Sequence, residues 1–259
     1  MKNHSIHILP GALLLATLIL LFTGCVSGRY RMAKEGTPPP ELLHVPLATT
    51  PLGVELTSLI TYGGPGSWKR NAFWDEYVVT LHNPGNQPLT INAASLVDFT
   101  GAAQSVGDNP WDLEKASKTL ERKYKDIGVA FVRYTAPAAL IVGAGFAYVG
   151  GATTLSAAFT TAATATIVLI PVYYLGVVII NHHNKTEVEK EFNRRRLVLP
   201  LTLSPGGTIV GSFFFPMVPN PRSLNLRWSS GPAGGESALP LDFLHGLHVK
   251  AAVTATPKS

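Results

Sequence analysis

The chain contains segments with a two-residue hydrophobic period and one long stretch that carries no charge. Residues 134–184 include no Asp, Glu, Lys or Arg. Gly150 and Gly151 interrupt this stretch, so the pattern predicts two apolar helical arms, residues 134–149 and 154–180, joined by a tight turn. A segment of roughly 18 or more apolar residues can cross the hydrocarbon layer of a membrane. The second arm reaches that length, and the first only approaches it.

Small residues at four-residue spacing indicate how the two arms pack. Because small side chains let helix backbones approach closely, the rows predict a transmembrane helical hairpin. The rows consist of Ala139, Gly143, Ala147 and Gly151 in the first arm and Ala157, Thr161 and Ala165 in the second. Arg133 and Lys185 border the stretch, where their long side chains could reach the membrane interface. A hairpin buried in its own protein or against other copies would show the same pattern.

Segments rich in β-branched residues, with alternating polar and apolar positions, lie on both sides of this stretch. Three precede it and four follow it, which is the number of strands expected of an antiparallel β-sandwich. The predicted strands are residues 54–62, 76–82, 89–99, 197–203, 208–215, 223–228 and 239–249. The turn Asn83-Pro-Gly-Asn-Gln-Pro88 between two of them resembles the opening of immunoglobulin-like sandwiches in exported bacterial proteins. The resemblance concerns architecture alone and implies no activity.

Mixed-charge helices are predicted next to both arms. Asn109 can cap a helix that has Pro110 at its first position and continues through residues 111–126. Residues 185–196 form the second charged helix, so the simplest arrangement is a stalk that continues the hairpin. The expected fold class is therefore α+β: a seven-stranded immunoglobulin-like sandwich with a long inserted helical hairpin.

The pattern also predicts the order of the parts along the chain. The expected parts are a signal peptide (1–24), a lipidated cysteine with a Pro/Gly-rich tether (25–42), the first part of the sandwich (43–108), the helical insertion (109–196), the second part of the sandwich (197–250) and a tail (251–259).

Composition narrows the class of protein. Only 14% of the residues are charged, which is low for a soluble protein and fits a chain with membrane segments. The net charge is +5, but the one tight basic cluster, Arg194 to Arg196, follows Glu187, Glu189 and Glu191. We therefore expect no nucleic-acid partner, because that function needs a broader basic patch. With one cysteine, Cys25, the chain cannot form an intrachain disulfide.

The amino terminus has a weakly positive start at Lys2, followed by an apolar run over residues 8–22. It ends in Thr23, Gly24 and Cys25, and so resembles the signal of bacterial lipoproteins, although Phe22 replaces the usual Leu, Val or Ile. The resemblance implies cleavage before Cys25 and acylation of Cys25, including palmitate. Several acyl chains hold a protein on a membrane durably. The alternative is an uncleaved membrane anchor with an incidental cysteine.

The resemblance also implies a location. Val26 occupies the position where an Asp retains many bacterial lipoproteins at the inner membrane, so the outer membrane is favoured over the inner one. The expected location is the bacterial cell envelope, with the folded part facing the periplasm. The proline run at residues 38–40 should stiffen the tether that follows Cys25.

A search for reactive groups finds two weak metal-ligand patterns. His183 and Glu187 share one helix face, and His245 and His248 lie close in sequence to Asp242. Neither pattern has the spacing and the third ligand of a zinc site, so we expect no metal, no cofactor and no catalytic residue. Nucleophile elbows and phosphate-binding loops are missing from the sequence.

Two functions fit these patterns better than a third. The first is a non-catalytic envelope lipoprotein that binds membrane lipid and another envelope protein, or copies of itself. The second is an oligomeric pore or remodelling ring built from the membrane-inserted hairpin. A metal-dependent enzyme that uses the histidines ranks third.

Overall fold

The computed structural model describes residues 30–33, 39–48, 51–133 and 170–250. Within these ranges the chain is mostly β-structure, with eleven strands, two α-helices and one short 3-10 helix, η2 (Asp242–Leu244). The strands are β1 (Arg31–Met32), β2 (Val45–Ala48), β3 (Gly53–Ile60), β4 (Lys69–Arg70), β5 (Asp75–His82), β6 (Leu89–Val97), β7 (Ala103–Ser105), β8 (Leu201–Leu203), β9 (Thr208–Phe215), β10 (Ser223–Ser230) and β11 (Ala233–Pro240). The helices are α2 (Pro110–Asp126) and α3 (Ile170–Arg195).

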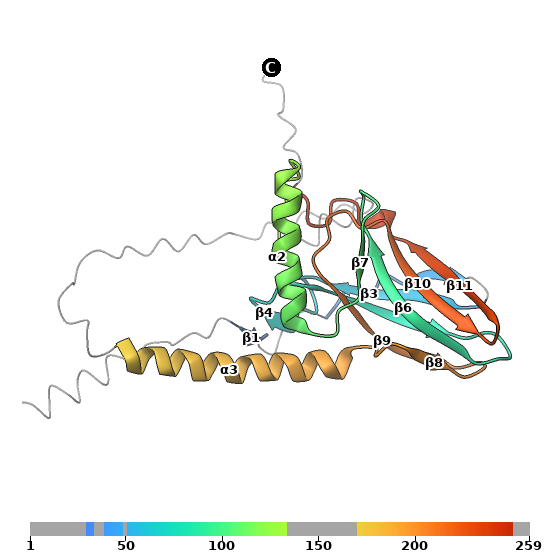
Figure 1. Cartoon of the computed structure of the whole chain (residues 1–259), viewed down its shortest axis with the longest axis horizontal. Coiled ribbons are helices and arrows are strands. Elements are labelled where there is room, and N and C mark those ends of the chain that lie inside the picture. Colours follow the sequence, from blue (N-terminus) through green and yellow to red (C-terminus); the bar gives the residue numbers. More distant parts are fainter. Residues whose placement is uncertain (1–29, 34–38, 49–50, 134–169, 251–259) are drawn as a thin grey trace, which may run out of the picture.

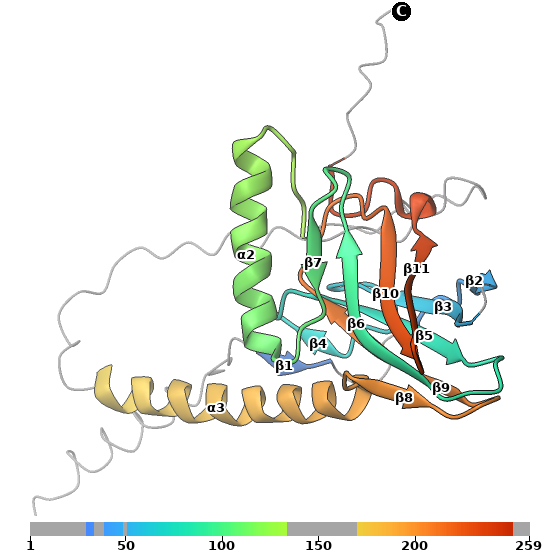
Figure 2. The same ribbon diagram turned by 45° about the vertical axis from the view of Figure 1, so that its right-hand side comes forward.

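Two larger antiparallel sheets pack as layers (Figures 1 and 2). One has the strand order β2-β3-β5-β9, and the other has β11-β10-β6-β7 with β8 also paired to β6. Their facing side chains form one apolar core, which includes Leu56, Tyr77 and Leu81 from the first sheet and Ile91 and Leu226 from the second. The third sheet is the short pair β1-β4. A sandwich-like arrangement of sheets therefore forms the body.

Strand β9 separates two cores because successive side chains on a strand point to opposite faces. Phe213 and Phe215 enter the core between the sheets. Phe214 points to the outer face and enters a second cluster, where its ring centroid lies 4.2 Å from that of Phe192 in α3. Three consecutive phenylalanines thus hold a sheet to its partner sheet on one side and to a helix on the other.

Helix α2 begins as the sequence predicts. The Asn109 side chain accepts a hydrogen bond from the Trp111 backbone N–H at 2.8 Å, and Pro110 occupies the first helical position. Leu113 packs into the second cluster, whereas Leu120 and Tyr124 pack into the core between the sheets. One amphipathic helix therefore contacts both cores.

The predicted fold class is wrong in its helical part. The two described helices are not the flanks of a stalk: α2 stands along one end of the sheets, and α3 runs across that end (Figures 1 and 2). They meet near the first turn of α2, where the Trp111 indole N–H donates to Glu189. Trp74 and Phe214 supply large apolar surfaces for α3 on the sheet side, and these decide its direction. The pore hypothesis depended on a hairpin, and residues 134–169 of that hairpin lie outside the described residues.

The prediction of a transmembrane helix is also corrected. Among the described residues, no helix combines the length and the apolar character that a membrane span requires. Helix α3 fails this criterion because its carboxyl-terminal half is highly charged. Residues 185–195 contain seven charged side chains: Lys185, Glu187, Glu189, Lys190, Glu191, Arg194 and Arg195.

The predicted count of seven strands is wrong as well. Six of the predicted segments overlap strands β3, β5, β6, β8, β9 and β10, but β1, β2, β4 and β7 were not predicted. The last predicted strand, 239–249, is mostly the 3-10 helix and a loop. The strand there is β11, whose sequence Ala-Gly-Gly-Glu-Ser-Ala-Leu-Pro is poor in strand-forming residues. Eight paired positions along β10 impose the strand conformation on it.

Part of the segment predicted to be a tether lies against the body. Strand β1 pairs with β4, and the Ala33 backbone N–H donates to the Trp68 carbonyl at 2.7 Å. Gly66, with φ +73°, lies so close to Pro40 that a Cβ on the glycine would be 2.7 Å from the proline Cβ. Tyr30, the first residue that the structure describes, is already buried in the second cluster, five residues after Cys25.

Candidate functional site

The place where α2 and α3 meet the sheets is lined by aromatic rings. We call it the helix junction; its buried residues are Tyr30, Trp68, Ala72, Trp74, Leu113, Val188, Phe192 and Phe214, with Trp111 packed against them. Trp74 lies edge-to-face against Trp111 at 6.1 Å and against Phe192 at 6.2 Å. Such edge-to-face pairs add roughly 0.5–1.5 kcal/mol each beyond their buried area. The junction fixes both helices on one side of the sandwich.

A buried carboxylate lies beneath the helix junction. Glu76 alternates with Tyr77 along β5, so Glu76 points outward under α3 while Tyr77 points into the core. The Glu76 carboxylate accepts hydrogen bonds from the Trp68 indole N–H at 2.5 Å, from the Ser212 hydroxyl at 2.6 Å and from Arg195 at 3.3 Å. Arg195 is the last residue of α3, so Glu76 ties the end of that helix to the sheet.

Lys69 is buried in the same region. Its Nζ lies 5.0 Å from the centre of the Trp74 ring and 5.8 Å from that of Trp68, and it makes no hydrogen bond within the described part of the chain. Burial lowers the pKa of Lys69 to about 8, although Asp75 and Glu76 partly oppose the shift. A neutral lysine amine can act as a nucleophile. With only 1% of Lys69 exposed, however, the surrounding rings separate this amine from solvent.

A second buried polar pair joins distant parts of the chain. The ring Nε2 of His248 lies 2.7 Å from Asp75 Oδ2, and both side chains are fully buried. His248 Nδ1 faces the Val132 carbonyl at 3.1 Å, and its ring stacks on Phe131. His248 therefore holds residues 131–132 against the start of β5. The structure separates it from His245, its partner in the predicted metal pattern, which is exposed.

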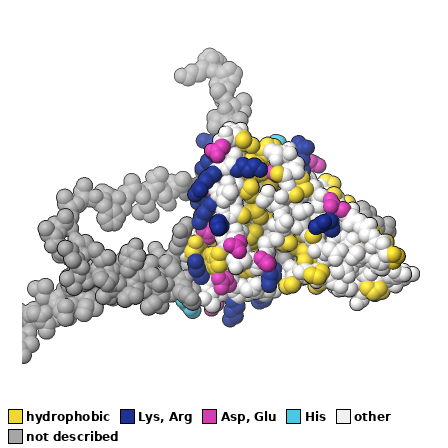
Figure 3. All heavy atoms as spheres, in the orientation of Figure 1, with side chains coloured by type: hydrophobic (Ala, Val, Ile, Leu, Met, Phe, Trp, Pro, Cys, Tyr) yellow, Lys and Arg dark blue, Asp and Glu magenta, His cyan; other side chains and the backbone are white. Residues whose placement is uncertain are grey.

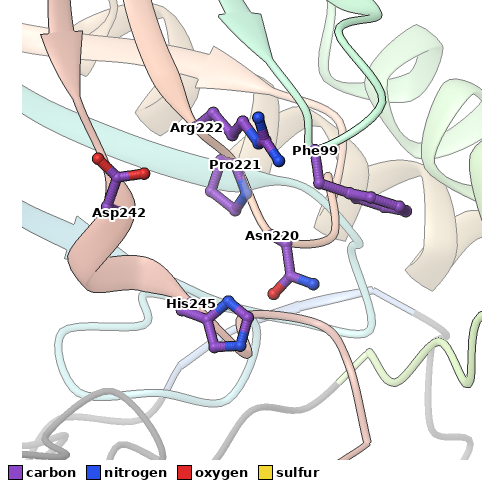
Figure 4. A pocket seen from close by; sticks show the side chains of 6 residues that line it. All are labelled: Phe99, Asn220, Pro221, Arg222, Asp242 and His245. Atoms are coloured by element: carbon purple, nitrogen blue, oxygen red, sulfur yellow. The ribbon is translucent and has the colours of Figure 1, made fainter.

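The described residues form a pocket at the end of the sandwich where α2 ends. Its volume is about 480 Å³, and its lining consists of Phe99, Asn220, Pro221, Arg222, Asp242 and His245 (Figure 4). Asn220, with φ +45°, follows β9, and its side-chain oxygen accepts the Gly246 backbone N–H at 2.6 Å. This bond brings the loop before β10 next to the loop after η2.

The charged groups of this pocket are available to a ligand. The side chains of Arg222, Asp242 and His245 make no hydrogen bond or ion pair with the described residues. The pocket thus combines a guanidinium, a carboxylate, an imidazole and an amide with one aromatic ring. Such a set of groups can bind a small polar group, and the guanidinium can form paired hydrogen bonds to a carboxylate. The set lacks the adjacent base and nucleophile that acyl transfer needs.

The two residues predicted to lie at a membrane interface have defined partners. Arg133 forms an ion pair with Glu121 at 2.7 Å, and its guanidinium lies 4.5 Å from the centre of the Phe73 ring. Lys185 extends over the rings of Trp111 and Tyr30, with its Nζ 4.8 Å and 5.4 Å from their centres. The structure does not bring the two residues together, and their interface role remains a prediction.

The other predicted site residues fall outside the described residues. They are Cys25, proposed for lipidation, and the helix-packing positions Ala139, Gly143, Ala147, Gly151, Ala157, Thr161 and Ala165. His183 and Glu187 are described, but no group of three His, Cys, Asp or Glu side chains suited to a metal ion occurs in the described ranges.

Charge is distributed unevenly over the body. Lys and Arg side chains gather on the side where α2 stands and along the edge where α3 lies, whereas the opposite end of the sheets is mostly uncharged (Figure 3). Sequence reasoning missed Tyr30, Lys69 and Glu76 as members of one site. A usable signal was the density of aromatic residues around them, since three of the four tryptophans, Trp68, Trp74 and Trp111, lie there.

Comparison with known proteins finds no matching family model, no similar curated protein and no similar solved structure.

Proposed function

We propose that this protein is a non-catalytic lipoprotein of the bacterial cell envelope, held on a membrane by acylated Cys25. The observation that carries the proposal is the position of Tyr30, which is buried in the helix junction five residues after Cys25. Its hydroxyl donates to Glu114 at 3.1 Å, and its ring lies 4.7 Å from that of Trp111. Because a buried residue of the folded body follows the proposed acylation site by only five residues, acyl chains on Cys25 would hold that body near the membrane.

We also propose that the body binds another envelope component through the pocket lined by Arg222. Two observations support this part. The charged groups of the pocket lack partners in the described part of the chain, and the buried ionisable groups elsewhere are enclosed by packing. A carboxylate-bearing partner suits the guanidinium, because the two groups form paired hydrogen bonds.

Metabolic labelling tests the anchor. Cells that produce the full chain or its Cys25→Ser variant are fed labelled palmitate, and the purified proteins are compared. We expect label in the wild-type protein and none in the variant, together with release of the variant from the membrane fraction. Equal labelling of the two proteins would overturn the proposal.

Site-specific photocrosslinking tests the pocket. A photoreactive residue at Phe243, beside the pocket residue Asp242, is compared with one at Val210, an exposed position on β9. We expect a defined adduct in intact envelopes from position 243 and not from 210, and we expect Arg222→Ala to abolish it. An adduct that persists in the Arg222→Ala protein would show that the pocket is not the binding site.

A further inference from the structure

We infer that the protein stands on its membrane with one face against the lipid headgroups and with the Arg222 pocket directed away from them. This anchor-proximal face consists of Arg31, Met32, Trp111 and Lys185, which lie around the buried Tyr30. The inference rests on the proposed acylation of Cys25. It adds the orientation of the body and names the bilayer surface as the partner of this face.

The segment between Cys25 and Tyr30 is short. A fully extended chain covers at most about 3.6 Å per residue, so the five residues from Cys25 to Tyr30 span no more than about 18 Å. Tyr30 cannot leave the body without losing its contacts with Trp111 and Glu114. Acyl chains on Cys25 therefore keep Tyr30 within about 18 Å of the acylated cysteine, whatever path the five residues take.

The chemistry of the face suits that position. Met32 is 37% exposed, and Arg31 beside it is exposed as well. The amine of Lys185 lies over the rings of Tyr30 and Trp111. Tryptophan with Lys or Arg beside it is typical of the boundary between lipid and water, where apolar rings and charged heads can both be accommodated. Trp111 is partly exposed at this face, whereas Tyr30 is buried.

Helix α3 lies on the same side of the molecule. It crosses the body next to β1 and extends away from the sheets in both ribbon views (Figures 1 and 2). The part farthest from the sheets, residues 170–180, contains no charged residue in its sequence. The uncharged end of α3 thus extends from the side of the body to which Cys25 is tied.

Helix α2 runs from this face to the pocket, so its length gives the distance between them. Trp111 in its first turn contacts Tyr30, and Tyr124 in its last turns lies 5.9 Å from Phe99, a residue that lines the pocket. Thirteen residues separate Trp111 from Tyr124, and a helix rises 1.5 Å per residue, so the two ends lie about 20 Å apart. The pocket therefore opens beyond the layer that headgroups occupy.

A matched pair of labels tests the orientation. Met32 and Phe243 are both large exposed apolar residues, with 37% and 38% of their surface accessible, and Phe243 adjoins the pocket residue Asp242. The variants Met32→Cys and Phe243→Cys of the full chain are labelled with a fluorophore and reconstituted into vesicles that carry nitroxide on the lipid headgroups. Because acylation consumes the thiol of Cys25, the introduced cysteine is the only one that reacts.

We expect quenching at position 32 to be at least about threefold stronger than at position 243, because the two sites differ in height by most of the length of α2. Equal quenching, or stronger quenching at 243, would overturn the inference. Arg70→Cys, at the exposed residue of β4, which pairs with β1, gives a second near label if Met32→Cys fails to fold. Fluorophore on the protein without an introduced cysteine would reveal a free Cys25 and would refute the anchor instead of the orientation.

Discussion

The core between the sheets and the helix junction bury similar aromatic side chains but treat buried charge differently. In the sandwich, buried acids lie at strand ends: Asp75 is the first residue of β5, and Asp98 follows β6. In the junction, the buried side chains of Lys69 and Glu76 lie directly among the rings. The sheets are therefore joined mainly by apolar area, whereas the helices are joined to them by aromatic contacts and a few hydrogen bonds.

The two regions therefore have different roles: one sets the stability of the body, and the other sets the position of α3. Apolar burial contributes roughly 25 cal/mol per Å² with little dependence on direction, so the sandwich core sets the stability of the body. A buried charge costs free energy unless its partners are placed correctly. The charged groups of the junction therefore favour a single placement of α3 over alternative ones, and that placement sets the anchor-proximal face.

The largest effect expected comes from adjacent residues of β9 that face the two cores. Phe213→Ala should lower the free energy of unfolding by about 3–5 kcal/mol, because it leaves a cavity between the sheets. Phe214→Ala should lower it by less, about 2 kcal/mol, because α3 can separate locally while the sandwich stays folded. Urea denaturation gives the first quantity, and hydrogen exchange of residues 183–195 gives the second. Equal global losses, with no extra exchange in α3, would show that the two regions are one cooperative unit.

The next largest effect is expected to be a gain in stability instead of a loss. Lys69→Met should stabilise the protein at pH 7, because lowering the pKa of a lysine from 10.5 to about 8 corresponds to about 3 kcal/mol of unfavourable burial. Between these pH values the unfolded chain binds more protons than the folded one, so the stability of the wild type rises from pH 8 toward 10.5. The gain in the variant should be complete below pH 8 and shrink above it. Denaturation of both proteins at several pH values measures the difference.

The exposed Lys115 of α2 provides the matched control for this prediction. Lys115→Met should change stability by less than about 0.5 kcal/mol at any of these pH values. A destabilised Lys69→Met protein would mean that attraction to Asp75 and Glu76 outweighs the cost of burial.

A smaller effect is expected at the far end of α2, on the sandwich side. The Tyr124 hydroxyl donates to Asp98, whose side chain also accepts hydrogen bonds from Thr100 and Ala102. Burial alone would raise the pKa of Asp98, but these hydrogen bonds lower it below its ordinary 3.8. Tyr124→Phe should cost roughly 1.5–3 kcal/mol at pH 7, because it removes a hydrogen bond to a charged group.

The pH dependence provides the check on this interpretation. A depressed carboxyl pKa contributes stability above the ordinary value, and that contribution is lost as the pH falls through 3.8 to the lower folded value. The difference between wild type and Tyr124→Phe should therefore decrease in that acidic range. A difference that stays constant between pH 7 and pH 3 would assign the cost to packing instead of the hydrogen bond.

The smallest effect is expected at the first turn of α2, on the junction side. Asn109→Ala should lower stability by about 1 kcal/mol, because two backbone N–H groups lose their acceptor. Asn109→Asp keeps an acceptor at the cap and should cost much less. A melting temperature that moves equally in both variants would show that the cap does not contribute through its side-chain oxygen.

Local patterns determined much of the fold before any tertiary contact was known. The alternation of Tyr77, Val79 and Leu81 is enough to predict β5, because only a strand places every second side chain on one face. Asn109 and Pro110 mark the start of α2 for reasons confined to one turn of helix. Thr23, Gly24 and Cys25 support an acylation site by resemblance alone.

Tertiary contacts decided the rest. The glycine-rich β11 is a strand because β10 pairs with it along its whole length, and no local preference indicates this. The direction of α3 depends on Trp74 and Phe214, which lie far from it in sequence and meet it only after the sheets have formed. The burial of Lys69 likewise depends on tertiary packing, which places its amine beside the rings of Trp68 and Trp74. A hydrophobic pattern records which side of an element is apolar, but the partner that covers that side is fixed by the packing of the whole chain.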